Sequence, residues 1–130
     1  MTRLDEARQN LEAFGFDKAR TNVRAARTLL ALTQLDEQSQ WADAVNPMLG
    51  VRAILDWIRE RLDVDVAENT RETYRRQTLH QFRDAGFVIY NDDDPARPTN
   101  SSANNYRINP EALKVVRLYG TPSFDTALSD

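Results

Sequence analysis

Apolar positions recur at helical spacing along most of the chain. Between Arg3 and Phe14 the spacing predicts a helix, and Gly15 follows as its stop. A second helix is predicted to run through Thr33, with Thr21 or Asn22 as its N-cap. Its buried side is expected to consist of Val23, Ala26, Leu29, Leu30 and Leu32.

The segment 36–46 is mostly polar and predicts a loop in which Trp41 serves as an aromatic plug. Pro47 is predicted to open a third helix to about Leu62, because the missing N–H of proline costs nothing in a first helical turn. A turn over 63–68 follows this helix. The apolar stripe of the helix is Val51, Ile54, Leu55, Ile58 and Leu62.

The stretch 69–86 is the most informative part of the chain. Asn69 or Thr70 is expected to cap a fourth helix, which ends at Gly86. At about 100° per residue, one arc of this helix faces the core and comprises Tyr74, Thr78, Leu79, Phe82 and Ala85. The opposite arc is polar and comprises Asn69, Thr73, Arg76, Gln77, His80 and Arg83.

Two short apolar runs, 87–90 and 105–108, predict a β-hairpin joined by a long polar segment. Asn109 and Pro110 then predict a capped helix to about Tyr119, with Gly120 as its stop and a short turn after Thr121. A helix followed at once by a two-stranded ribbon is the order found at the end of a winged helix-turn-helix. We therefore predict a mainly α fold with a small β-hairpin, whose second helix usually lies against DNA.

Composition favours one globular domain. The 130 residues suffice for a single core, and no run approaches the ~18 apolar residues of a membrane helix. The N-terminus lacks the order of a signal peptide. The chain has no cysteine and one histidine, which argues against disulfides and a zinc site. We expect a cytoplasmic protein without bound metal, membrane contact or small-molecule substrate.

The polar arc offers both kinds of side chain that DNA recognition needs. Arg76 can donate two hydrogen bonds to guanine and Gln77 can pair with adenine, while His80 or Arg83 can reach the DNA backbone. Arg71, Thr73 and Arg75 lie in the first turns, where the helix dipole favours an anion. The full set of predicted DNA-binding residues is Asn69, Thr70, Arg71, Thr73, Arg75, Arg76, Gln77, His80, Arg83 and Arg97.

Two features favour plainer interpretations. The net charge is -3, so any basic surface must be local, and the arc is also compatible with a solvated face that carries Arg76–Glu72 and Arg83–Asp84 pairs. The segment 91–104 places Asp92, Asp93 and Asp94 where like charge would repel phosphate, and Arg97 is its only base. Such a segment is also typical of a plain turn-rich loop.

Catalytic motifs are missing from the sequence. It has no glycine-rich phosphate loop, nucleophile elbow or zincin pair. Magnesium nucleases of the restriction type usually need an acid two residues before a lysine. Phe16 and Ala112 precede Lys18 and Lys114, the only two lysines, at that distance. We therefore expect no catalytic residue in this chain.

The segment from Trp41 to Thr121 resembles the N-terminal helix-turn-helix domain of the BsuBI/PstI family of type II restriction endonucleases. The run Arg75-Arg-Gln-Thr-Leu-His-Gln-Phe followed by Asp84-Ala-Gly is the most specific part of the match, and Leu29-Leu-Ala-Leu32 also fits. Further matching runs are Trp41-Ala-Asp-Ala-Val-Asn-Pro-Met-Leu, Asp56-Trp-Ile-Arg-Glu, Asn69-Thr-Arg-Glu-Thr, Tyr90-Asn, Asn100-Ser and Tyr119-Gly-Thr.

The resemblance implies an enzyme that cuts both strands of double-stranded DNA at a short palindromic site, as a homodimer using Mg²⁺. It also implies a nuclease core C-terminal to this domain, which is absent here. Residues 1–130 are then a single winged helix-turn-helix domain, with N-terminal helices in 1–40 and the helix-turn-helix, wing and closing helix in 41–120. A truncated chain or a standalone relative would bind DNA without cutting it.

Two other function classes remain open at this point. The acidic balance fits a module for dimerisation or for docking onto the nuclease core. The missing catalytic motif fits a standalone transcriptional regulator of a restriction–modification locus.

Overall fold

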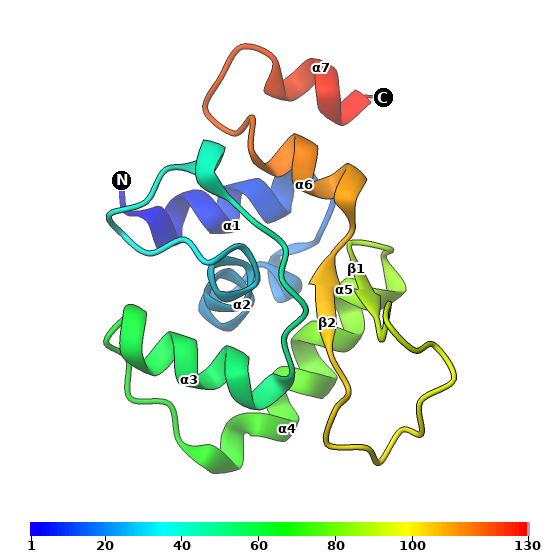
Figure 1. Cartoon of the computed structure of the whole chain (residues 1–130). Coiled ribbons are helices and arrows are strands. Elements are labelled where there is room, and N and C mark those ends of the chain that lie inside the picture. The colour runs from blue at the N-terminus through cyan, green and yellow to red at the C-terminus, as the bar shows by residue number, and fades with distance from the viewer. Residues whose placement is uncertain (130) are drawn as a thin grey trace.

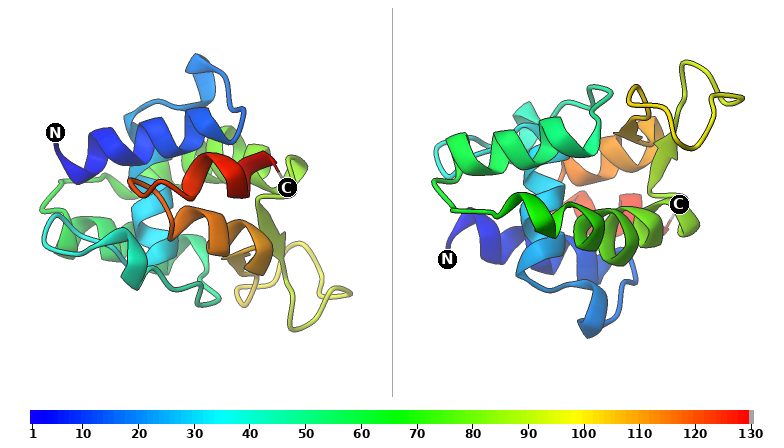
Figure 2. Two further views of the ribbon diagram at one scale, coloured as in Figure 1. Left: turned by 90° about the horizontal axis from the view of Figure 1, so that it is seen from above. Right: turned by 90° about the horizontal axis from the view of Figure 1, so that it is seen from below.

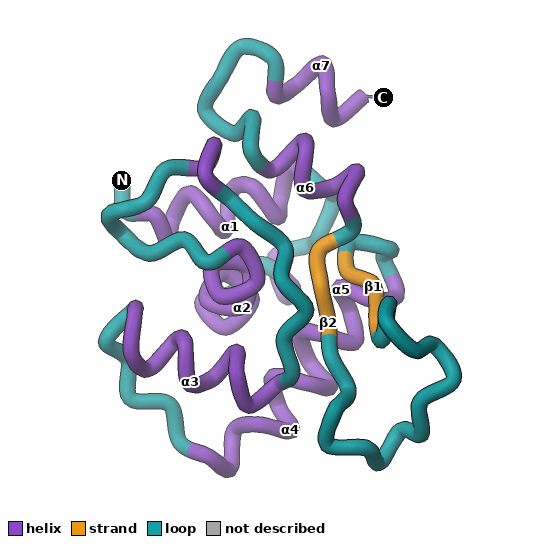
Figure 3. The backbone as a smooth tube through the Cα atoms, viewed as in Figure 1, coloured by secondary structure: helices purple, strands orange, loops and turns teal. Residues whose placement is uncertain are grey.

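A computed structural model describes residues 1–129 of the chain (Figures 1 and 3). Its α-helices are α1 (Arg3–Ala13), α2 (Val23–Thr33), α3 (Val51–Arg61), α4 (Arg71–Tyr74), α5 (His80–Asp84), α6 (Pro110–Val116) and α7 (Phe124–Ser129). Its strands are β1 (Val88–Tyr90) and β2 (Tyr106–Ile108). Three 3-10 turns are η1 (Lys18–Arg20), η2 (Trp41–Asp43) and η3 (Glu68–Thr70), and η4 (Arg75–Leu79) is a π-helical turn.

Helix α2 forms the centre of the core and runs between α1 and α3 (Figure 1). A helix buried on nearly all sides needs small or apolar residues all round, and α2 supplies them from Ala25 onward except at the half-buried Arg27. The predicted core positions Ala26, Leu29, Leu30 and Leu32 are confirmed as fully buried. The prediction for Val23 was wrong: it is the first residue of the helix, ahead of the buried part, and is 38% exposed.

Local signals set the ends of the first two helices. Gly15 has φ +98, a conformation that L side chains rarely adopt, and it follows α1 as predicted. Of the two caps considered for α2, Asn22 is the one used, since its side-chain oxygen accepts from the Ala25 N–H at 2.8 Å. Sequence signals therefore located both helices to within about one residue.

The start of α3 was predicted wrongly. Pro47 does not open the helix, which begins at Val51 after the cap residue Gly50. Leu49 is instead extended, because its N–H and C=O both bond the backbone of Tyr106, each at 2.8 Å. A Cβ on Gly50 would lie 3.1 Å from the Asn104 carbonyl, so the chain passes close to the hairpin here. The predicted apolar stripe is still buried from Val51 to Ile58, with Leu62 half-buried.

The predicted fourth helix is one continuous helix made of α4, η4 and α5. Tyr74, Thr78, Leu79 and Phe82 are buried as predicted, and the middle of the helix is a π-helical turn. Ala85 is exposed, against the prediction, because it is the C-cap that follows the last turn.

The predicted cap of this helix is confirmed only in position. Thr70 is the N-cap residue, but its side chain does not cap the helix, because its hydroxyl donates to the Ala67 carbonyl at 2.6 Å.

The predicted hairpin is confirmed as an antiparallel pair with Val88 opposite Ile108 and Tyr90 opposite Tyr106. Seen from below, the loop between the strands projects from the body of the molecule (Figure 2). The side chain of Asn109 caps α6 as predicted, but the helix ends at Val116, earlier than the predicted Tyr119.

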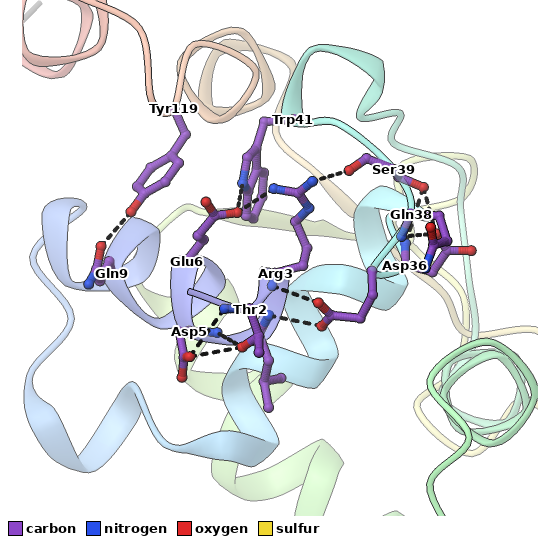
Figure 4. A network of polar contacts seen from close by, with 12 residues as sticks. Thr2, Arg3, Asp5, Glu6, Gln9, Asp36, Gln38, Ser39, Trp41 and Tyr119 are labelled. Carbon is purple, nitrogen blue, oxygen red and sulfur yellow. Dashed lines mark hydrogen bonds and ion pairs between the residues drawn. The ribbon is translucent and has the colours of Figure 1, made fainter.

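Trp41 is a buried plug, as predicted, and joins three parts of the chain (Figure 4). Its Nε1–H donates to Glu6 of α1 at 3.1 Å, and Glu6 also pairs with Arg3. Arg3 donates to the Ser39 carbonyl, and the Tyr119 hydroxyl donates to Gln9 of α1 at 2.6 Å. These contacts attach α1 to the loop before α3 and to the segment after α6. Within residues 1–129, none of the helices has the length and apolar content to span a membrane.

The Leu49–Tyr106 pairing gives a stability test. We expect Leu49→Pro to lower the free energy of unfolding by about 1–3 kcal/mol more than Leu49→Ala, since only proline removes the N–H and leaves the Tyr106 carbonyl without a donor. Urea denaturation of both variants measures the difference. Equal values would mean that this backbone pairing contributes nothing.

Candidate nucleic-acid interface

The polar arc predicted from the sequence forms the outer face of α4, η4 and α5. All the predicted contact residues on this helix are exposed: Arg71, Thr73, Arg75, Arg76, Gln77, His80 and Arg83. Asn69 is exposed and Thr70 half-buried in the turn just before them. The structure therefore places nine of the ten predicted residues on one helix or at its start, and Arg97 in the loop.

Four of these side chains line a cleft of about 390 Å³ between the helix and the hairpin. Arg75, Arg76, His80 and Arg83 form its helical wall. The opposite wall consists of Tyr90 and Tyr106, which face each other across the hairpin, and Thr99 from the loop. A narrow hollow with three arginines on one wall suits a polyanion.

Glu72 balances part of this positive charge. The Arg75 guanidinium donates to it twice, from Nε at 2.9 Å and from Nη2 at 2.6 Å, and Arg76 Nε lies 3.2 Å from the same carboxylate. The hydrogen bond from Arg75 lowers the pKa of the Glu72 carboxyl, so it stays ionised at neutral pH. The Arg76–Glu72 pair expected on a solvated face is thus present.

Arg83 is held by an aromatic ring rather than by an acid. Its Cζ lies 4.2 Å from the centroid of the Tyr90 ring, close enough for a cation–π contact. The expected Arg83–Asp84 pair does not form, since Asp84 pairs with His80 at 3.3 Å. Tyr90 packs in turn on Tyr106, with ring centroids 5.1 Å apart. Burial raises the pKa of the Tyr106 hydroxyl, which therefore stays neutral at physiological pH.

Arg97 turns into the loop instead of outward. Its guanidinium donates to Asp93, to the Asn91 side-chain oxygen and to the Ala103 carbonyl, and its side chain is only 16% exposed. Asp92 pairs with Arg107 at 3.1 Å. Two of the three loop acids therefore have basic partners, which weakens the repulsion of phosphate that the sequence suggested.

A larger hollow of about 780 Å³ lies at the other end of the hairpin. Its apolar lining includes Phe14, Phe16, Phe87, Val115 and Leu128, and its charged residues are of both signs. It presents no concentration of positive charge. Within residues 1–129, no three His, Cys, Asp or Glu side chains are grouped closely enough to hold a metal ion.

Sequence reasoning missed the hairpin wall of the cleft. Tyr90, Tyr106 and Thr99 were not among the predicted contacts, although Tyr90 and Tyr106 sit in the two apolar runs that predicted the hairpin. The sequence held only part of the signal. An end-to-end pairing of 87–90 with 105–108 would place Tyr90 opposite Asn105, and the observed register is shifted by one residue, which puts Tyr90 opposite Tyr106.

Comparison with known proteins points in one direction. The family model described as the BsuBI/PstI restriction endonuclease HTH domain matches residues 1–130. The type II restriction enzyme BsuBI of Bacillus subtilis is 36% identical over 126 residues, which are 97% of this chain and 40% of that enzyme. The type II restriction enzyme AplI of Arthrospira platensis is 30% identical over 125 residues, or 96% of this chain and 38% of that enzyme.

A solved structure agrees with these sequences. The SdaI restriction endonuclease superposes with a TM-score of 0.93 at 42% identity, over 98% of this chain and 40% of that one. At this similarity the two share a fold. The chain spans only about two fifths of the length of each of these relatives.

The Asp93–Arg97 pair predicts a pH dependence of stability. Arg97, with the Asn105 amide, lowers the pKa of the Asp93 carboxyl from its ordinary 3.8 to about 2. Because the folded pKa is depressed, the pair stabilises the fold above 3.8, and this contribution is lost as the pH falls towards about 2. Asp93→Asn should therefore have a lower Tm than the unmodified chain at neutral pH, and the two values should converge in that acid window.

Asp94→Asn is the matched control, because Asp94 forms no ion pair within the described residues and its Tm should follow the unmodified chain throughout. Thermal unfolding followed by circular dichroism gives the comparison. A neutral-pH Tm unaffected by Asp93→Asn would contradict the prediction.

Proposed function

Because this chain belongs to the BsuBI/PstI restriction endonuclease HTH domain family, we propose that it is a winged helix-turn-helix domain that recognises double-stranded DNA for a type II restriction endonuclease. The observation that carries the proposal is the cleft, in which three arginines and a histidine from one helix face the hairpin. The net charge of -3 makes this concentration informative, since it cannot reflect a chain that is basic throughout.

The order of elements supports the winged assignment. Helix α2 is followed by the extended Leu49, then by α3, the α4–η4–α5 helix, β1, the loop 91–104 and β2. Leu49 pairs with Tyr106 of β2 on the side away from Tyr90. This one-residue bridge adds a third extended segment to the hairpin, and in the chain it lies between α2 and α3. The α4–η4–α5 helix is then the recognition helix and the loop is the wing.

The contacts divide by exposure and position. Gln77, Thr73 and Arg76 reach base edges in the major groove, while Arg71 and Arg83 contact phosphates. Asn69 and Thr70 lie beside the helix start, where backbone N–H groups also attract phosphate. Arg97 acts by holding the wing in shape, and His80 extends the basic wall towards the backbone.

At the level of a whole enzyme we propose that a nuclease core outside this region cuts DNA at a short palindromic site with Mg²⁺, as a homodimer. Residues 1–130 then serve as one DNA-binding domain without catalytic residues of their own. A homodimer suits a palindrome because each copy reads one half-site.

A docking module is the second candidate, and the apolar hollow lined by Phe14, Phe16 and Phe87 favours it. In that case the chain would bind its own enzyme's core or a second copy, and the basic cleft would have no DNA affinity. A single DNA-binding measurement distinguishes the two functions.

Fluorescence anisotropy of the chain with a random duplex and with a pool of palindromic duplexes, at two salt concentrations, tests the proposal. We expect binding that weakens steeply with salt and prefers some palindromes. Absence of binding to every duplex at low salt would overturn the proposed function in favour of docking.

Removal of Arg71 tests the phosphate assignment. Within the described residues Arg71 has no carboxylate partner, so Arg71→Ala should weaken binding to every duplex by a similar factor and reduce the salt slope by about 1. Arg20→Ala is the control of equal charge change, since Arg20 lines the apolar hollow and should leave the affinity unchanged. Unequal losses across sequences would assign Arg71 to base reading instead.

A further inference from the structure

Glu72 binds one edge of the Arg75 guanidinium. Its carboxylate accepts hydrogen bonds from Nε–H and from one N–H of Nη2, which is the side-on arrangement of an arginine and a carboxylate. A guanidinium has five N–H donors, so the outer edge formed by Nη1 and the second N–H of Nη2 remains free. That outer edge presents two parallel donors, the pattern that matches O6 and N7 of guanine.

Arg75 is fixed more firmly than its neighbour Arg76. Its side chain is 47% exposed and lies in the cleft with Tyr90 and Tyr106, while the Arg76 side chain is 74% exposed and reaches Glu72 through a single 3.2 Å contact. A guanidinium already held in one orientation loses less freedom when it meets a base edge. A loosely held one is better suited to phosphates, which accept donors from many directions.

Glu72 also carries a cost that requires an explanation. A carboxylate on a face that approaches phosphates weakens binding to any sequence through like-charge repulsion. Its lowered pKa keeps that negative charge present at neutral pH. Repulsion that acts on every duplex lowers all affinities by a similar factor, so the ratio of specific to random binding increases only through the contact that an oriented Arg75 makes with some duplexes.

We propose that Glu72 is a specificity-determining residue, which holds Arg75 so that its free edge reads the guanine of one G·C pair, while its charge weakens binding to every duplex and only duplexes with this contact offset that loss. The inference rests on the proposed function and deepens it. It also moves the guanine contact from Arg76, to which the sequence assigned it, to Arg75.

The experiment measures Kd for a duplex selected from a randomised palindromic pool, for all its single-base-pair variants and for a random duplex. The chains are the unmodified protein, Glu72→Gln, Arg75→Lys and the double variant. Arg75→Lys keeps the charge and loses the fork. Glu111→Gln is the matched control, because Glu111 also forms an exposed i,i+3 ion pair, with Lys114 of α6, away from the cleft. Circular dichroism melts verify that every variant is folded.

We expect Glu72→Gln to bind the random duplex about 3- to 10-fold more tightly, and to lose about tenfold of its discrimination at one G·C position. Arg75→Lys should lose discrimination at the same position, and the double variant should lose no more there than Arg75→Lys alone. Glu111→Gln should match the unmodified chain at every position. A purely structural role of Glu72 would change all duplexes equally and would not select one base pair.

The outcomes separate the inference from the function beneath it. If the unmodified chain prefers certain palindromes but Glu72→Gln keeps that preference at every position, the inference is wrong and the proposed function stands. Additive losses from Glu72→Gln and Arg75→Lys, or losses at different positions, would also overturn it. If the unmodified chain binds no duplex, both are wrong.

Discussion

The candidate interface depends on the backbone of Tyr106, which is paired on both sides. On one side it lies opposite Tyr90 in the hairpin, and on the other its N–H and C=O bond Leu49 at 2.8 Å. Leu49 is followed by Gly50 and then by α3, so this one residue joins the hairpin to the helix layer. A two-stranded ribbon alone is marginal in water, and the Leu49 pairing adds to the packing of the hairpin against α2 and α5. It therefore helps to fix the distance between the tyrosine wall of the cleft and the α4–η4–α5 helix.

Features of the fold that depend on neighbouring residues could be predicted from the sequence, and features that depend on contacts between distant segments could not. The ends of α1 and α2 and the hairpin came from periodicity and caps, which act over a few residues. The false start at Pro47 had the opposite origin, since proline permits a helix start but the geometry is decided by a partner in β2, far along the chain. The inward turn of Arg97 likewise depends on its contacts with Asn91, Asp93 and Ala103, which no local pattern records. No pattern in the sequence indicated the π-helical turn at Arg75–Leu79.

Net charge and local charge are separate quantities in this molecule. Asp92 and Asp93 are paired with Arg107 and Arg97, so much of the loop's acidity is balanced within the loop and the strand that follows it. On the α4–η4–α5 helix only Arg75 and Arg76 share an acid, Glu72, and Arg83 lies over Tyr90, so the cleft keeps an excess of positive charge. An acidic chain can therefore present a basic hollow to a polyanion, provided that its acids are paired elsewhere.

The way each arginine is held indicates what it can read. Glu72 accepts hydrogen bonds from Nε and Nη2 of Arg75, and the Tyr90 ring stacks on the face of the Arg83 guanidinium. Both guanidinium groups are therefore oriented, while their outer N–H donors stay free. Such preorganisation reduces the entropy lost on binding and favours partners of fixed geometry. Arg71 has no acid within the described residues, and Arg76 has one contact of 3.2 Å with Glu72, so neither guanidinium is held in one orientation as Arg75 is. Of the two oriented arginines, only Arg75 is held by a charge that also penalises phosphate. Under the proposed function, discrimination between sequences would therefore depend on Arg75 more than on Arg83.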